Sequence, residues 1–182
     1  YAMILGIILG VIFAVMTMSS NPVVGAMARF YIWFFRGTPL LLQLLLWFNL
    51  ALVYPRMGLP GLFEYRTVDV ITPFLASLLG LGIGQGAYTA EVVRGGIMSI
   101  DPGQTEAARA VGMTRITTLR RIVLPQALRV IIPPIGNEII AMIKLTSVAS
   151  VIQYDEVLHN AQTIYYANAR VIELLIVATV WY

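Results

Sequence analysis

Residues 106–125 read EAARAVGMTRITTLRRIVLP and lie between two of the most apolar runs in the chain. The segment combines small side chains, a central glycine at position 112 and four arginines. An arginine-rich connection between apolar runs is typical of a loop that stays on the cytoplasmic side of a membrane. The stretch therefore predicts a membrane-embedded helical fold organised around one basic loop.

The amino-acid composition identifies the solvent. Of the 182 residues, 59% are hydrophobic and 12% are charged, and the mean hydropathy is +0.82. So few polar side chains cannot cover a water-soluble globule of this length, so the surface must face lipid. The chain has no cysteine and one histidine, His159, which excludes disulfides and leaves no metal site. The net charge of +3 does not favour a nucleic-acid partner. We expect an all-α integral membrane protein with no catalytic residues, metal or cofactor.

Apolar runs predict about five transmembrane helices in a single domain, residues 1–182. A crossing needs roughly 20 apolar residues, so the first run, 1–16, is expected to begin upstream of Tyr1. Asn21 is expected to cap an interfacial helix over 23–35 that has Pro22 at its first position. The other crossings are predicted at 40–53, at 70–93, at 127–145 with a bend near Pro133 and Pro134, and from 171 onward. The loop 54–69 is expected outside the hydrocarbon, and 146–170 as a short helix plus a loop.

Small residues indicate which of these helices pack closely. Gly6 and Gly10 have the GxxxG spacing that lets two helix backbones approach each other. The third span carries small residues over much of its surface, which predicts that other helices surround it; they are Gly80, Gly82, Gly84, Gly86, Ala87 and Ala90.

The distribution of arginines predicts the orientation. Six arginines but only two acidic residues fall within 94–129, whereas the loop 54–69 has two charges of each sign. By the positive-inside rule, residues 94–129 face the cytoplasm. Within them, Asp101 is a good N-cap for a helix that starts at Pro102 and ends at Gly112, and Thr114 can cap a second helix. This loop is either a docking surface for another protein or an ordinary basic loop at the lipid headgroups.

The residues of this loop resemble a known family. Glu106, Ala107, Ala108 and Gly112, followed by the Ile-x-Leu-Pro of 122–125, fit the EAA signature of the membrane permeases of ABC importers. The segments FFRGTPLLLQL, GAYTAEVVRGGI, IDPGQTEAARAVG and KLTSVASVI are similar to the polar amino acid permeases of that family. The similarity extends from about residue 21 to residue 170.

The resemblance implies a type I importer fold in a bacterial inner membrane, with the loop 101–125 carrying the coupling helix. It implies a permease for polar amino acids that pairs with an identical or homologous permease subunit. Two cytoplasmic ATPase subunits and an extracytoplasmic solute-binding protein are the other expected partners. The ATPase contact is expected at Glu106, Ala107, Ala108, Gly112 and Met113.

A pathway for a polar solute needs polar side chains within the spans, where ionisable groups are costly and therefore functional candidates. Those in or near the spans are Gln43, Gln85, Glu91, Asn137, Glu138, Lys144 and Glu173. Glu91 and Arg94 are expected to form an ion pair, and Glu138 either pairs with Lys144 or meets a substrate ammonium. Lys144, with the hydroxyls of Thr146 and Ser147, is a candidate to receive a substrate carboxylate. The predicted pathway residues are Gln85, Asn137, Glu138, Lys144, Thr146, Ser147, Asp155 and Glu156. Asp155 and Glu156 serve either the pathway or the contact with the binding protein. Gln85 serves either the pathway or the packing of helices.

Other function classes fit less well. The chain has no GxxxxGK[ST] phosphate-binding loop, so ATP hydrolysis must belong to a partner. A membrane enzyme would need a nucleophile with its base or a metal-binding carboxylate pair, which the sequence does not contain. An ion channel would explain the glycine-rich third span but not a docking loop. A permease of the same fold for another small polar solute is the main alternative.

Overall fold

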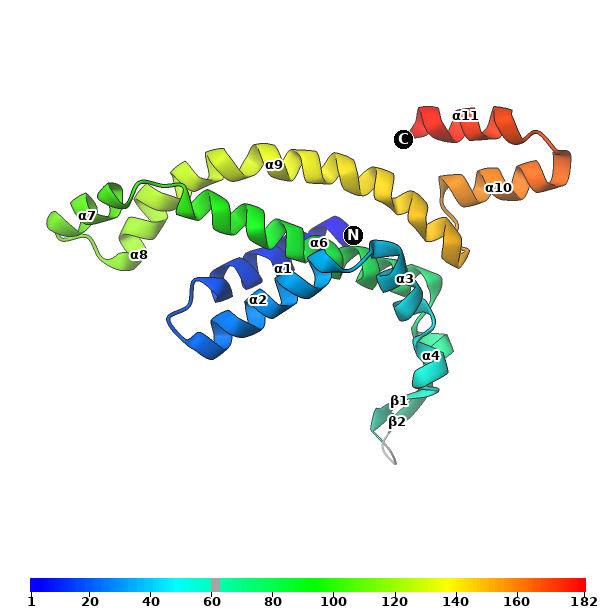
Figure 1. Ribbon diagram of the computed structural model, residues 1–182, viewed down its shortest axis with the longest axis horizontal. Coiled ribbons are helices and arrows are strands. Elements are labelled where there is room, and N and C mark those ends of the chain that lie inside the picture. Colours follow the sequence, from blue (N-terminus) through cyan, green and yellow to red (C-terminus); the bar gives the residue numbers. More distant parts are fainter. Residues whose placement is uncertain (60–62) are drawn as a thin grey trace.

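The computed structural model describes residues 1–59 and 63–182, which form an elongated assembly of helices with one small hairpin (Figure 1). The elements are α1 (Ala2–Thr17), α2 (Pro22–Gly37), α3 (Leu40–Phe48), α4 (Leu50–Val53), β1 (Arg56–Leu59), β2 (Phe63–Arg66), α5 (Thr67–Val70), α6 (Pro73–Met98), α7 (Pro102–Ala110), α8 (Arg115–Thr118), a π-helical turn (Leu119–Val123), α9 (Leu124–Leu145), a 3₁₀ helix (Thr146–Ile152), α10 (Val157–Asn168) and α11 (Val171–Trp181). The expected α-helical class is confirmed.

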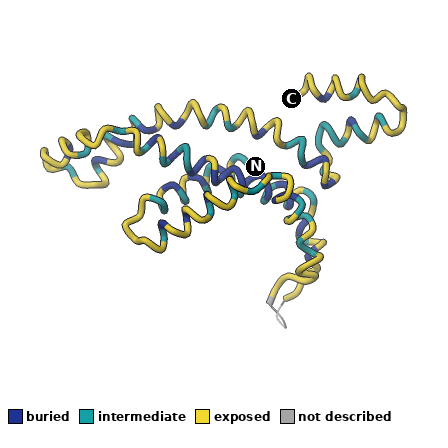
Figure 2. Tube along the Cα trace, in the orientation of Figure 1, coloured by how far each residue is buried: buried dark blue, intermediate teal, exposed yellow. Residues whose placement is uncertain are grey.

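Helix α6 is the centre of the fold. It has 26 residues, about 39 Å at 1.5 Å per residue, and α1, α2, α3 and α9 all contact it. The GxxxG prediction holds, because a Cβ on Gly6 would come 2.7 Å from Gln85 Cγ and one on Gly10 would come 2.5 Å from Thr89 Cγ2. Figure 2 shows the buried residues gathered along α6 and the helices that cover it. The glycines therefore set the separation of α1 and α6.

Helices α2 and α3 are joined by a sharp break. Thr38 has an extended backbone (φ −104°, ψ 139°), as expected for a residue before proline, and the two helices differ in direction by 100°. Together they are long and apolar enough for one crossing. This differs from the prediction, because 40–53 is divided between α3 and α4, and the expected interfacial helix buries Ala28 and Ile32 in the core.

The loop after α4 folds into a two-stranded antiparallel hairpin, which the sequence analysis did not predict. Arg56 pairs with Arg66 and Leu59 with Phe63 in its register, and Arg56 forms an ion pair with Glu64 at 3.0 Å. The position Gly61, predicted to lie in an external loop, is outside the described residues. The hairpin lies at the opposite end of α6 from α7 (Figure 1).

Residues Arg115–Ile152 form one continuous helical stretch, long and apolar enough to cross a bilayer. It begins with α8 and continues through the π-helical turn just before Pro125, whose nitrogen carries no hydrogen to donate to the preceding turn. Pro133 and Pro134 lie inside α9, and the expected bend is a gentle curve in Figure 1 rather than a break. Its outer face is lined by exposed isoleucines and valines, as is typical of contact with lipid or with another subunit.

The C-terminal part forms an arm of two helices. In place of the predicted short helix plus loop, 146–170 forms a 3₁₀ helix and α10, which packs against α11 (Figure 1). The Glu156 carboxylate caps α10 by accepting hydrogen bonds from the backbone of Leu158 at 2.8 Å and His159 at 2.6 Å. It also accepts a hydrogen bond from the Tyr182 hydroxyl near the end of α11, which ties the two helices together.

Candidate functional site

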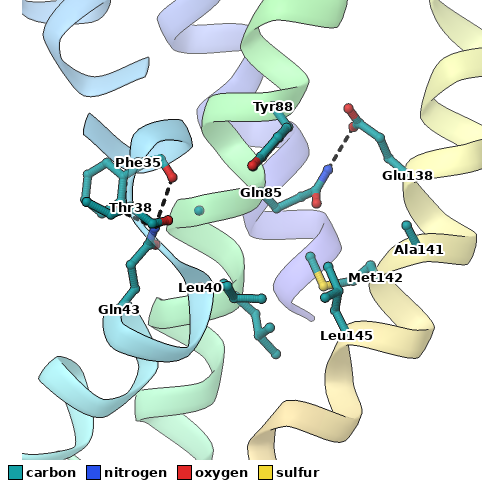
Figure 3. A pocket seen from close by; sticks show the side chains of 12 residues that line it. Phe35, Thr38, Leu40, Gln43, Gln85, Tyr88, Glu138, Ala141, Met142 and Leu145 are labelled. Atoms are coloured by element: carbon teal, nitrogen blue, oxygen red, sulfur yellow. Dashed lines mark hydrogen bonds between the residues drawn. The ribbon is translucent and has the colours of Figure 1, made fainter. Parts of the chain in front are cut away.

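A cavity of about 280 Å³ lies between the α2–α3 break, α6 and α9 (Figure 3). Helices α6 and α9 each present one face to it, with residues spaced i, i+3, i+4 and i+7 along the chain. The lining residues are Phe35, Thr38, Leu40 and Gln43 at the break, Leu81, Gly84, Gln85 and Tyr88 on α6, and Glu138, Ala141, Met142 and Leu145 on α9. Most of this surface is apolar, so its few polar groups determine what it can bind.

Three polar side chains meet at one wall of this cavity. The Glu138 Oε2 atom accepts hydrogen bonds from Gln85 Nε2 and from the Thr89 hydroxyl, both at 2.8 Å. Gln85 Nε2 also lies 3.2 Å from Thr89 Oγ1. Gln85 and Thr89 are one turn apart on α6, so both donors point from the same face toward α9. The cluster is the polar connection between two long helices whose other contacts are largely apolar.

The α1 glycines hold these donors in position. Gly6 lies directly behind Gln85 and Gly10 directly behind Thr89, with no room for a Cβ at either place. Thr89 is fully buried and Gln85 is 8% exposed. Because α1 closes the far side of α6, the two side chains are directed at Glu138. The glycines of α1 thus orient the polar side chains Gln85 and Thr89 of α6.

Gln43 forms the opposite wall. Its Nε2 donates to the Phe35 carbonyl at 3.0 Å, to the Thr38 carbonyl at 3.1 Å and to the Thr38 hydroxyl at 2.8 Å. Within a helix the Phe35 carbonyl would accept from residue 39, but Pro39 has no N–H. The Gln43 amide supplies that missing donor. Its Oε1 is buried against Gly84 without a partner in the described part of the chain.

The other predicted pathway residues lie outside the cavity. Asn137 and Lys144 are exposed on other faces of α9, and in the described residues no ion pair joins Lys144 to Glu138. The Thr146 hydroxyl donates to the Ile143 carbonyl and the Ser147 hydroxyl to the Lys144 carbonyl. Asp155 is exposed beside His159, and Glu156 is the cap of α10. Of the eight predicted residues, the structure brings Gln85 and Glu138 together.

Two residues of this site were not in the predicted set. Thr89 follows Gln85 by four positions, a spacing that places both on one helix face, so the sequence did carry a signal for it. Gln43 was recognised as a polar residue in a span, but its task depends on the missing N–H of Pro39. The predicted ion pair is confirmed: Arg94 Nη2 lies 2.7 Å from Glu91 Oε2, and Arg94 Nε lies 3.1 Å from Oε1.

The loop between α6 and α9 is built as predicted. Asp101 Oδ1 accepts from the Gly103 backbone at 2.8 Å, and the Thr114 hydroxyl accepts from the Thr117 backbone at 3.3 Å. Gly112 has φ +82°, in the left-handed region that favours glycine. Its N–H bonds the Arg109 carbonyl at 2.9 Å, and the next N–H, of Met113, bonds the Ala108 carbonyl at 3.0 Å. This pair of bonds is the Schellman motif, which ends a helix by turning the chain away.

The surface of α7 is divided. Glu106, Ala107 and Gly112 are exposed, Met113 is partly buried, and Ala108 is 5% exposed and faces the rest of the chain. No atom lies within 4 Å of a Cβ built on Gly112. The exposed part of the predicted contact set therefore forms a small, smooth surface at one end of the molecule (Figure 1).

An elongated helical fold with an apolar surface, a largely apolar cavity that holds a few polar groups, and a basic loop at one end is typical of a membrane transport component. Residues 6–181 match the family described as the binding-protein-dependent transport system inner membrane component, and the chain belongs to that family. It is 44% identical to the arginine transport system permease protein ArgU of Corynebacterium glutamicum, over 100% of this chain and 58% of that protein. The chain thus spans little more than half the length of this relative.

Two further comparisons agree. The chain is 38% identical to the nopaline transport system permease protein NocM of Agrobacterium fabrum, over 97% of this chain and 72% of that protein. Its fold matches a chain in the crystal structure of an amino acid ABC transporter with histidines, with a TM-score of 0.85 and 37% identity, covering 100% of this chain and 78% of that one. The predicted permease fold and family are therefore confirmed.

Proposed function

We propose that this chain forms the translocation pathway of an ATP-driven importer for a polar amino acid. The observation that carries the proposal is the cavity at the α2–α3 break, where a carboxylate and two amides face a space enclosed by apolar helices. Polar groups among apolar membrane helices are energetically costly unless they form hydrogen bonds with a solute or with water. The relatives named above are permease proteins of an arginine and of a nopaline transport system.

Glu138 and Gln85 are the central pathway residues of this proposal. Asn137, Lys144, Thr146, Ser147, Asp155 and Glu156 line no part of the cavity, so a role for them belongs to other stages of transport or to contacts with partners. The exposed outer face of α9 and the C-terminal arm support a second permease subunit, identical or homologous, packed against them.

The partners follow from the loop and from the family. We propose that each of the two ATPase subunits docks on the coupling loop 101–125 of one permease subunit, at the exposed Glu106, Ala107 and Gly112 and the partly buried Met113, with Ala108 supporting them from behind. The rigid caps at both ends of α7 support this, since a docking helix has to hold its angle. An extracytoplasmic solute-binding protein would meet the opposite end, near the hairpin.

The proposed topology is a multi-pass protein of a bacterial inner membrane with 94–129 in the cytoplasm. The six arginines of that segment support this orientation, since basic loops remain on the cytoplasmic side. The length of α6 and of Arg115–Ile152 supports crossings on either side of the loop.

The experiment fills the cavity. Ala141→Phe projects a ring into it from α9, and Ile140→Phe, at the neighbouring exposed position, is the matched control. Both variants would be reconstituted with the ATPase and the binding protein in liposomes, and ATP-dependent amino acid uptake and complex assembly would be measured. We expect Ala141→Phe to assemble but not transport, and Ile140→Phe to do both. Normal uptake by Ala141→Phe would refute this pathway.

A further inference from the structure

The cavity contains one carboxyl group. Among its twelve lining residues Glu138 is the only acidic residue, and none of them is basic. In the described part of the chain no lysine or arginine forms an ion pair with it. Arg36 packs over the Tyr88 ring at 5.4 Å but does not line the cavity, and Lys144 is exposed elsewhere on α9. A counter-charge from outside the protein would stabilise a partly buried carboxylate that has no cation of its own.

The hydrogen bonds at this wall leave acceptors free. Both protein donors reach the same oxygen, Glu138 Oε2, so no described donor reaches Oε1. The Gln85 amide is fixed in orientation, because its Nε2 faces the carboxylate and reversing it would place Oε1 against a negative charge. Its Oε1 has no described protein donor and points away from Glu138 (Figure 3). The unused groups at this wall are therefore acceptors, one charged and one neutral.

We propose that the transported solute is an amino acid with a cationic side chain, and that its terminal guanidinium or ammonium binds the Glu138 carboxylate. This deepens the proposed function and rests on it. A guanidinium carries several N–H groups in a planar fork that suits a carboxylate.

The side-chain end of the solute fits this wall better than its α-ammonium end. An α-ammonium would bring its own carboxylate to within a few ångströms of Glu138, in a lining with no basic residue to offset the repulsion. A side-chain cation keeps that carboxylate several methylene groups away. Its apolar stem then lies against Leu81, Met142 and Leu145, which line the same cavity.

The test compares two solutes that differ at the side-chain terminus alone. L-arginine and L-citrulline have the same α-amino and carboxyl groups and nearly the same size, but citrulline has a neutral urea group in place of the guanidinium. Binding of each would be measured by calorimetry on the purified permease–ATPase complex without the solute-binding protein, so that the selectivity of that protein does not contribute. The variants are Glu138→Gln and, as a matched charge change outside the cavity, Glu173→Gln.

We expect the wild-type complex and Glu173→Gln to bind arginine at least about ten-fold more tightly than citrulline, since an unpaired buried charge disfavours the neutral ligand. In Glu138→Gln the preference should fall to within about two-fold. Equal binding of the two solutes by the wild type, or an unchanged preference in Glu138→Gln, would overturn the inference. If the wild type prefers citrulline or glutamine and Ala141→Phe abolishes that binding, the cavity remains the pathway and only the cationic solute is wrong. If Ala141→Phe binds and transports like the wild type, the proposed function fails as well.

Discussion

The Gln43 amide donates hydrogen bonds to two carbonyl groups at the break between α2 and α3. Replacing Gln43 with methionine tests whether these bonds stabilise the break. Methionine has a similar length and no donor, so the side chain still fills the space beside Gly84. The Phe35 and Thr38 carbonyls then lose the N–H groups that now reach them at 3.0 and 3.1 Å. Pro39 cannot replace them, because it has no N–H.

The magnitude follows from counting unsatisfied groups. Two carbonyls left without donors cost about 1–3 kcal/mol each, while removing the buried, unpartnered Gln43 Oε1 returns about 1–3 kcal/mol. The net loss of stability is therefore about 1–3 kcal/mol. For a chain of this length, 1 kcal/mol corresponds to roughly 2–4 °C in the unfolding midpoint, so we expect a decrease of about 2–12 °C.

The assay is thermal unfolding of the purified complex in detergent. Gln43→Glu should be less stable than Gln43→Met, because a carboxylate facing three oxygen acceptors adds repulsion to the missing donors. Thr38→Val is the milder control, since it removes the hydroxyl acceptor and leaves both carbonyl contacts of Gln43 in place. A midpoint for Gln43→Met equal to or above that of the wild type would show that Pro39 and packing alone hold the break.

Three other predictions follow from the loop and the pathway. Gly112→Val forces a β-branched residue to φ +82°, so it should lose ATPase recruitment while the permease fold loses only roughly 1–3 kcal/mol; intact binding-protein-stimulated hydrolysis would contradict the coupling role. A cysteine at Gly103 should react with impermeant thiol reagents from the cytoplasmic side, and one at Gly61 from outside; labelling of both from one side would refute the topology. Glu138→Ala should reduce uptake more than assembly, and Lys144→Ala, which lies outside the cavity, should reduce it less; equal uptake by both would remove Glu138 from the pathway.

Local features of this chain were predictable from the sequence. Asp101, Thr114 and Gly112 each satisfy or redirect backbone groups within a few residues of themselves, so residue type and spacing were enough to predict the helix ends. The Glu91–Arg94 ion pair also lies within one turn of a helix. Interactions of this range depend little on how the rest of the chain folds.

The contacts between distant segments were not predictable in the same way. Glu138 meets residues 49 and 53 positions away, and nothing in a single sequence states which helix face will oppose which. The glycines of α1 and α6 indicated close packing, but not that Gln85 and Thr89 would be pressed toward α9. The hairpin likewise depends on long-range packing. The α2–α3 break depends on Pro39 and on the residues packed around it.

One error could have been avoided from helix geometry alone. Glu138 and Lys144 are six residues apart, which places them about 240° apart around a helix of 3.6 residues per turn. Such a pair points to different faces, whereas residues three, four and seven positions after Glu138 share its face. Those residues, Ala141, Met142 and Leu145, are the ones that line the cavity.

The same two helices carry both the coupling loop and the solute site. The loop joins the end of α6 to the start of the continuous helix Arg115–Ile152, so a movement of α7 shifts one helix relative to the other. Glu138 lies 23 residues from Arg115, about 35 Å along that helix, and its hydrogen bonds to Gln85 and Thr89 are the polar contact between the two helices. A displacement that separates α6 from α9 must break those bonds and release the carboxylate. The proposed docking of an ATPase on α7 and the proposed binding of a cation at Glu138 are therefore linked through these two helices.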